Sequence, residues 1–208
     1  MARRGGAPEV NAGSMADIAF LLLIFFLVTT TIETDAGLDR MLPPKEPPTD
    51  EQVILKQKNI FTVQIGKDGQ LLVEEDLLDL KDLREKAIAF LDNGGAVKGD
   101  PDYCSYCEGA RSPESSDNPI KAVISLKNDR ETKYSVYITV QNELVAAYNF
   151  LRNRAAKKLG YNMSFTEMEE AYSNQETPDD VKEKLKVKIK KIQDLYPQKL
   201  SEAETTTN

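Results

Sequence analysis

The chain has 208 residues, a formal net charge of −7 and no histidine. This length allows one modest folded domain with extensions, and the acidic balance argues against nucleic acid as a partner. Without histidine the chain lacks the commonest general base and the commonest neutral metal ligand, so we expect neither an enzyme nor a metal site.

Residues 10–32 form the only stretch of the sequence that is able to cross a membrane. The run from Ile18 to Ile32 has 15 residues without a charge, and as a helix it is roughly 22 Å long. The hydrocarbon core of a bilayer is ~30 Å thick. We therefore expect a single transmembrane helix over residues 10–32, which places Asp17 below the lipid headgroups.

An acidic residue is costly at that depth. An ionised Asp at the centre of a membrane helix costs on the order of 2.5–3.5 kcal/mol, so it needs a polar partner on another helix or a proton. A carboxyl group poised between its two states can relay protons, and we predict this role for Asp17. Small residues nearby, Gly13 and Ser14, would let a neighbouring helix approach closely. The helix face of Asp17 also contains Gly13, Leu21, Ile24, Val28 and Thr31.

Two other interpretations of this stretch are a plain membrane anchor and a secretory signal peptide cleaved near residues 34–36. Against a signal peptide, an acid opens the apolar run and the only basic residues before it are Arg3 and Arg4,. The same two arginines precede the span while acidic residues follow it closely. This bias predicts that residues 1–9 lie in the cytoplasm and the large domain lies outside.

Residues 33–52 contain four prolines within six positions. Proline fixes φ and removes a backbone donor, so this segment is predicted to be a semi-rigid, extended linker. Such a segment holds a domain away from a membrane, and a partner can capture it by strand addition.

Residues 53–160 are predicted to form a small α+β domain with two helices on one face of a sheet. A short strand at 53–55 is followed by an alternating strand at 59–65, a Gly66–Gly69 turn and a second strand at 70–73. The first helix has its apolar row at Leu80, Leu83, Ala87 and Leu91 and ends at Asn93-Gly94-Gly95,. A further strand at 120–126 precedes a long helix with its apolar stripe at Tyr137, Val140, Leu144, Tyr148, Leu151 and Ala155,.

Residues 92–118 interrupt this domain with four glycines, two prolines and almost no large aliphatic side chains. We expect a long loop that buries little. Its distinctive feature is Cys104-Ser-Tyr-Cys107, which in an oxidising compartment can close a local disulfide. The alternatives are a redox-active thiol pair, which is typical of a strand-to-helix junction, and a zinc site shared between two chains.

Residues 161–208 are strongly polar and are predicted to form a helical extension. Thr177 is placed to cap a helix that has Pro178 at its first position and acids in its first turn. The apolar stripe of this helix contains Val181, Leu185, Ile189, Ile192 and Leu195, and six lysines between Lys182 and Lys191 make a solvated face,. We expect it to dock on the domain or on a partner.

Several segments together resemble the ExbD/TolR family of biopolymer-transport proteins over roughly residues 8–160. The family pattern has an Asn, an Asp six positions later and an unbroken aliphatic and Phe run, and Asn11, Asp17 and Ile18–Val28 are similar to it. Leu42-Pro43 resembles the Leu-Pro that follows the family's span. The hairpin at 60–73 and the strand–helix unit at 122–137 resemble the family's domain. The long 92–118 insert and residues 161–208 depart from the family, as do Gly13 and Ser14, where members often have Thr-Pro.

This resemblance implies a stator subunit in the inner membrane of a Gram-negative bacterium, with a periplasmic domain and Asp17 as the proton acceptor. The two helices of a homodimer would sit inside a pentameric ExbB/TolQ-like ring, and Asn11 would be one of the helix-packing residues. The resulting rotation or tension would be delivered to a TonB-like protein. Protons would be the coupling ion, and no other cofactor is expected. The alternatives are a TolR-like role in outer-membrane maintenance, a membrane-anchored periplasmic binding module, and a thiol redox protein.

Overall fold

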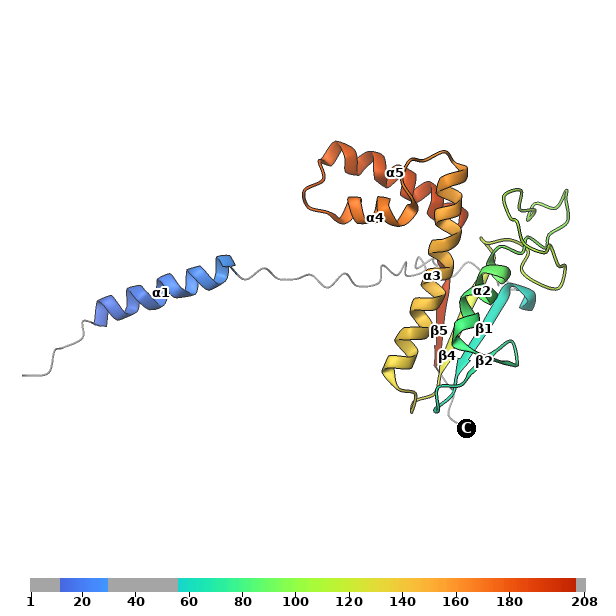
Figure 1. Cartoon of the computed structure of the whole chain (residues 1–208), viewed down its shortest axis with the longest axis horizontal. Coiled ribbons are helices and arrows are strands. Elements are labelled where there is room, and N and C mark those ends of the chain that lie inside the picture. Colours follow the sequence, from blue (N-terminus) through green and yellow to red (C-terminus); the bar gives the residue numbers. More distant parts are fainter. Residues whose placement is uncertain (1–11, 30–55, 205–208) are drawn as a thin grey trace, which may run out of the picture. The chain divides into compact units, whose positions relative to one another are not determined.

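The computed structural model describes residues 12–29 and 56–204. The chain divides into an N-terminal unit and a larger C-terminal unit (Figure 1). The N-terminal unit contains helix α1 (Ala12–Thr29). Residues 10–11 and 30–32 of the predicted span, the predicted linker at 33–52 and the predicted strand at 53–55 lie outside the described residues. Within the described ranges, no helix combines the length and the apolar character needed to span a bilayer.

The C-terminal unit is built on a five-stranded mixed sheet with the strand order β3-β2-β1-β4-β5. Strands β1, β2 and β3 form an antiparallel meander, while β4 runs parallel to β1 and β5 runs parallel to β4. Each parallel step needs a long crossover, and helical segments supply both crossovers. The strands are β1 (Ile60–Ile65), β2 (Leu71–Val73), β3 (Asp76–Leu78), β4 (Val123–Asn128) and β5 (Leu200–Glu204).

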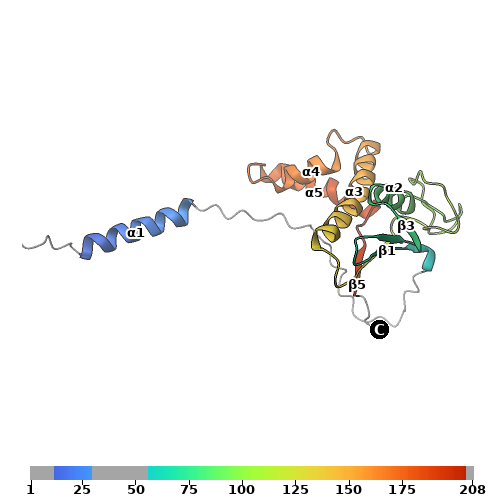
Figure 2. The ribbon, with the colours of Figure 1, turned by 60° about the horizontal axis from the view of Figure 1, so that its bottom comes forward.

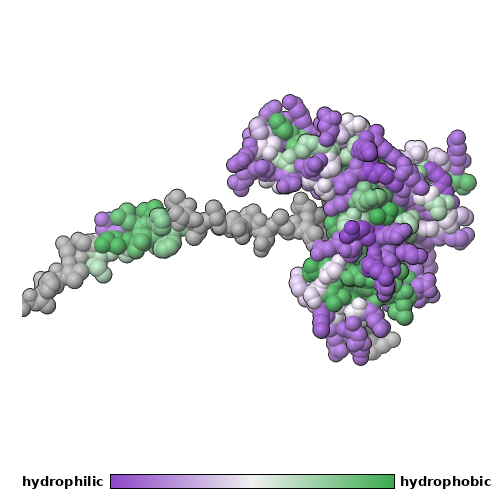
Figure 3. Space-filling model, viewed as in Figure 1, coloured by the Kyte–Doolittle hydropathy of each residue, from purple (hydrophilic) through white to green (hydrophobic). Residues whose placement is uncertain are grey.

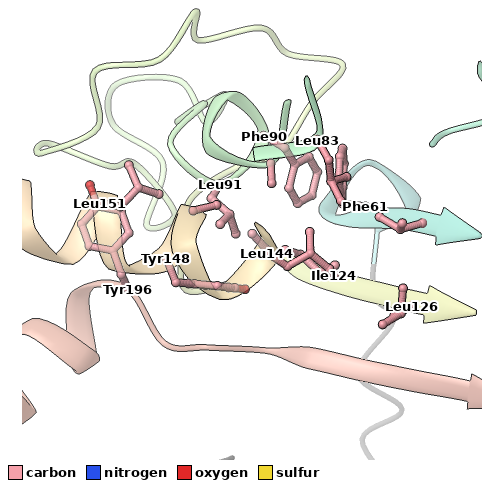
Figure 4. Packing of buried hydrophobic residues seen from close by; sticks show 14 of the residues in the cluster. Phe61, Leu83, Phe90, Leu91, Ile124, Leu126, Leu144, Tyr148, Leu151 and Tyr196 are labelled. Carbon is pink, nitrogen blue, oxygen red and sulfur yellow. The ribbon is translucent and has the colours of Figure 1, made fainter. Parts of the chain in front are cut away.

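Two helices, α2 (Leu80–Leu91) and α3 (Tyr134–Lys158), pack against each other over one face of this sheet (Figure 2). Burial alternates along β1, where Phe61, Val63 and Ile65 are buried, and Ile124 and Leu126 of β4 continue the same apolar face. The sheet and the helices therefore share one core (Figure 4). The predicted α+β class, the hairpin, both helices and their stripes are confirmed.

Strand β3 was not predicted. It follows β2 through Glu74 and Glu75, which have φ values of 50° and 78°. Two-residue hairpin turns of this kind usually carry Asn-Gly or Asp-Gly, because both central residues need positive φ. The Glu-Glu pair therefore gave no turn signal.

The described part of the predicted extension, residues 161–204, completes the same sheet. Helix α4 (Phe165–Ser173) begins with a capping box in which the Ser164 hydroxyl accepts from the Glu167 amide and the Glu167 carboxylate accepts from the Ser164 amide,. Helix α5 (Asp179–Leu195) follows it and packs against α4 and α3, and the chain then enters β5. This segment therefore belongs to the folded core of the domain.

Helix α5 begins one residue later than predicted. Pro178 occupies the N-cap position instead of the first helical position, and no side chain caps the helix, so the predicted capping role of Thr177 is wrong. The Thr177 amide instead donates to the carbonyl of Asn174 in the preceding turn. The buried residues of α5 are Leu185, Ile189 and Ile192, which confirms the central part of its predicted stripe.

The loop at 92–118 contains no helix or strand, as predicted, but the expectation that it buries little is wrong. Its buried residues are mostly polar: Asp92, Asn93, Ala96, Cys104, Cys107, Ser116, Asp117 and Asn118. A loop rich in polar side chains can be buried when its own hydrogen bonds satisfy them. Within the described residues, no buried side-chain nitrogen or oxygen lacks a hydrogen-bond partner.

Candidate functional site

Asp17 is the one ionisable residue of α1, and it lies in the second turn of the helix. Its spacing from Gly13, Leu21 and Ile24 is four, four and seven residues, so the four residues share one helix face. All four are exposed to solvent in the isolated chain. This face therefore presents one carboxyl group between a small residue on one side and bulky apolar residues on the other.

The described side chains from Ile18 to Phe26 form an exposed apolar surface (Figure 3). From Phe20 to Phe26 the exposed fraction of each side chain ranges from 41% at Ile24 to 62% at Leu23. Exposed apolar surface that is contiguous over several helical turns is normally covered by lipid or by other protein chains. The helix is therefore suited to an apolar environment, and Asp17 is its polar exception.

The structure describes only some of the other residues that were predicted to pack against neighbouring helices. Asn11 and Thr31 lie outside the described residues, and for Ser14 and Val28 the structure describes the helical backbone alone. The packing role assigned to Asn11, Gly13, Ser14, Leu21, Ile24, Val28 and Thr31 stays a prediction.

Cys104 and Cys107 are joined by a disulfide, with their Cα atoms 5.6 Å apart. Both residues are buried, whereas a redox-active cysteine needs an accessible sulfur, and sulfurs bonded to each other leave no thiolate for zinc. The Arg111 guanidinium holds the loop around them, since it donates to the carbonyls of Cys104 at 3.2 Å and Cys107 at 3.0 Å. This arrangement is that of a structural cross-link.

Asp117, at the end of the same loop, is a buried acid at the centre of an ion cluster whose two lysines reach the surface. Its carboxylate lies 2.6 Å from the Lys58 ammonium and 3.5 Å from the Lys56 ammonium, and it accepts from the Asn59 amide at 3.1 Å. The Asp117 backbone amide donates in return to the Asn59 side chain at 2.8 Å. Although burial alone would raise it, hydrogen bonds from Lys58 and Asn59 and the charges of both lysines hold the pKa of Asp117 below its ordinary value,.

Asp92, at the start of the loop, is the centre of a second buried cluster. One carboxylate oxygen lies 2.5 Å from an Arg154 guanidinium nitrogen and accepts from the Tyr196 hydroxyl at 3.0 Å. The other oxygen accepts from the Glu108 backbone amide at 3.1 Å. Arg154 also pairs with the Glu108 carboxylate at 2.9 Å. The cluster ties the end of α2 to α3 and to the end of α5.

Sequence reasoning missed both clusters. Asn93 was predicted only as part of a helix stop, and Asp92 and Asp117 were placed in a loop without a role. The partners of Asp92 lie 62 and 104 positions away in the sequence, and no local pattern announces such contacts. The glycines of this stretch are the one local feature that matches the close packing of the loop. A Cβ on Gly94 would lie 2.8 Å from the Cβ of Cys107, and one on Gly95 would lie 2.2 Å from the Ser112 carbonyl oxygen.

In the parts of the chain that the structure describes, no group of three or more His, Cys, Asp or Glu side chains is arranged to hold a metal ion. The polar clusters above are ion pairs and hydrogen bonds between protein groups. Among the described residues, Asp17 is the one ionisable side chain of α1, and the loop at 92–118 contributes Asp92 and Asp117 to the two clusters.

A comparison with family models matches residues 3–157 to the biopolymer transport protein ExbD/TolR family. The match includes α1, the loop at 92–118 and almost all of α3, and it ends before α4, α5 and β5. A search of the curated proteins finds no match. The matched segment covers about three quarters of the sequence and contains Asp17, the β1–β2 hairpin and β4. The chain therefore belongs to the ExbD/TolR family of biopolymer transport proteins.

Proposed function

We propose that the chain is the stator subunit of an energy-transducing complex of the inner membrane that is driven by the proton gradient. The single observation that carries this proposal is Asp17, one carboxyl group on a helix whose other described side chains are apolar and exposed. The family match supports it, because the ExbD/TolR family serves biopolymer transport. The proposed role is not that of an enzyme.

The proposed membrane span extends over residues 10–32. The described helix α1 has 18 residues, which corresponds to about 27 Å of helix. A helix that continued over residues 10–11 and 30–32 would be longer than the ~30 Å hydrocarbon core. The band of exposed Leu, Ile and Phe side chains supports this placement. Arg3 and Arg4 before the span favour a cytoplasmic N-terminus and a periplasmic domain,.

Asp17 would act as the proton acceptor at the junction between α1 and a surrounding ring of helices. In its protonated form the side chain is neutral and tolerates an apolar wall, whereas its ionised form requires a polar or basic partner. Alternating between these two states changes which neighbour the helix prefers. A charge that crosses 100 mV releases ~2.3 kcal/mol, so a few protons supply enough free energy for a mechanical step.

Family membership implies association with ExbB/TolQ-like and TonB/TolA-like proteins. We propose that a homodimer of this chain places its two α1 helices inside a pentameric ExbB/TolQ-like ring. The linker at 33–52 would then hold the periplasmic domain within reach of a TonB-like protein, which carries the work to TonB-dependent transporters of the outer membrane. A TolR-like role in outer-membrane maintenance is the alternative that the same family covers.

The proposal is tested by replacing Asp17 in cells. Asp17→Asn keeps the size and polarity of the side chain and removes its titratable proton. We expect normal membrane insertion and assembly but no energy-dependent uptake, whereas Asp17→Glu retains some uptake because the acid survives. Full uptake by Asp17→Asn at matched protein abundance would contradict the proposal and would favour a membrane-anchored binding module.

A further inference from the structure

The loop at 92–118 contacts the point where the chain enters the domain. A short 3-10 turn, η1 (Gln57–Asn59), leads directly into β1. Lys58 in this turn pairs with Asp117 at 2.6 Å and donates to the Pro113 carbonyl at 3.0 Å. Asn59 is buried and exchanges two hydrogen bonds with Asp117. Any pull on the preceding chain therefore acts first on these contacts.

The same loop contacts the C-terminal segment at its other side. Tyr106 lies between the two cysteines, and its hydroxyl donates to the Leu195 carbonyl at the end of α5 at 2.8 Å. Its ring packs edge-on against Tyr196 with the centroids 5.5 Å apart. Burial, with a smaller effect of Asp92, raises the pKa of Tyr106 to about 12, so the hydroxyl keeps its proton at neutral pH. Four residues after Tyr196 the chain enters β5.

A continuous series of hydrogen bonds joins these two ends. The Asn93 side chain donates to the Ser116 carbonyl, next to Asp117, at 2.8 Å. The Asn93 carbonyl accepts from the Arg111 amide at 3.0 Å, and the Arg111 guanidinium holds the carbonyls on either side of Tyr106. Asn93, Ser116 and both cysteines are buried. The bond between Asn93 and Ser116 is shielded from water, which strengthens it,, whereas Arg111 is itself exposed and its bonds to the two cysteine carbonyls are partly buried.

The buried part of the loop has little room to yield locally, whereas its stretch at 97–101 is exposed. The disulfide joins two of the buried residues, and Gly94, Gly95 and Gly109 sit where any Cβ would fall within 2.8 Å of another atom. A closely packed segment transmits a displacement instead of absorbing it. We therefore expect the buried residues of the loop to move together.

We propose that residues 92–118 form a brace that couples the entry turn at 57–59 to the C-terminal segment at 195–204. When the entry turn is displaced, the brace shifts and loosens the end of α5 and the pairing of β5 with β4. The disulfide is required because it fixes Tyr106 relative to Arg111. This inference concerns the folded domain and does not depend on proton transfer at Asp17.

Hydrogen exchange of the full chain in detergent micelles, followed by mass spectrometry, tests the brace. Asp117→Asn removes the charge that holds Lys58. We expect exchange to rise about tenfold or more at 57–59 and also at 195–204, which lie on the far side of the brace. Arg84→Gln is the matched control, because it breaks an exposed ion pair with Glu143 between α2 and α3, away from the brace. The control should leave both segments unchanged.

The reverse experiment uses Tyr106→Phe, which deletes a single hydroxyl and preserves packing. Faster exchange at 57–59 in this variant is expected, and in a Cys104→Ser/Cys107→Ser background each substitution should act only on its own side. Exchange changes confined to the side of the substitution in the disulfide-bonded protein would overturn the brace. Equal transmission with and without the disulfide would overturn the part assigned to the disulfide.

Discussion

Asp92→Asn should destabilise the domain far more than the substitution of an exposed acid. One Asp92 oxygen accepts from Arg154 and Tyr196, and the other accepts from the Glu108 amide. An asparagine has one acceptor oxygen and one donor NH2 group, so in either orientation its NH2 group faces a donor. The variant loses at least one hydrogen bond to a charged group and gains a donor–donor contact.

The size of this effect follows from the burial of the site. A hydrogen bond to a charged group is worth about 1.5–3 kcal/mol, and breaking a buried ion pair costs about 3–5 kcal/mol. In the variant Arg154 still pairs with the Glu108 carboxylate at 2.9 Å. We therefore expect the free energy of unfolding to fall by about 3 kcal/mol, the lower end of the range for a broken buried ion pair. For a domain of this size each kcal/mol lowers the melting temperature by about 2–4 °C, which predicts a decrease of about 6–12 °C.

Thermal unfolding of the full chain in detergent, followed by tyrosine fluorescence and circular dichroism, measures this decrease. Asp102→Asn is the matched control, since Asp102 pairs with Lys121 at a more exposed position of the same loop. Exposed ion pairs contribute about 0–1 kcal/mol, so the control should shift the melting temperature by a few degrees at most. Equal shifts for Asp92→Asn and Asp102→Asn would refute the buried cluster as a stabilising element.

Two further predictions concern the loss of thermal stability at low pH and the packing of α5 on the domain. Because the pKa of Asp117 is lowered in the folded protein, its stabilising contribution is present above the ordinary Asp pKa of about 3.9 and is lost as the pH falls through the lowered value. Melting temperatures measured below about pH 4 should therefore fall less steeply for Asp117→Asn than for the parent chain, and an unchanged slope would contradict this assignment. Ile189→Ala should cost about 2–5 kcal/mol because this side chain lies on the buried face of α5, whereas Val187→Ala, with 70% of that residue exposed, should stay within about 0.5 kcal/mol,. Similar effects of these two substitutions in chemical denaturation would show that α5 does not pack on the domain in solution.

The sequence predicts the parts of this fold whose signals are local. The β1–β2 hairpin follows from alternation and from the turn at 66–69, where Gly69 has a φ of 80°, and α2 and α3 follow from apolar spacing. Strand β5 has no such signal, because Ser201, Glu202 and Glu204 have low strand propensity and its order comes from main-chain pairing with β4,. Side-chain contacts from α3 add to that pairing, since Gln141 donates to the Glu202 carboxylate at 2.8 Å and Tyr137 also bonds to it.

The same division applies to the functional residues. Asp17 stands out from the sequence because a charge inside an apolar run is rare and costly. Asp92 and Asp117 do not stand out, because buried acids differ from exposed ones only through distant partners such as Arg154, Tyr196 and Lys58. The prediction of a loop at 92–118 was right about its backbone and wrong about its burial, because composition reports apolar content and cannot report satisfied hydrogen bonds.

Proton flux through the assembled complex is the most direct test of the role proposed for Asp17. The chain would be reconstituted in liposomes with its ring-forming partner, and flux would be followed with an internal pH-sensitive dye under an imposed proton gradient. We expect flux through the parent complex, a reduced flux with Asp17→Glu and background flux with Asp17→Asn at equal incorporation. Flux through the Asp17→Asn complex equal to that of the parent would contradict this role.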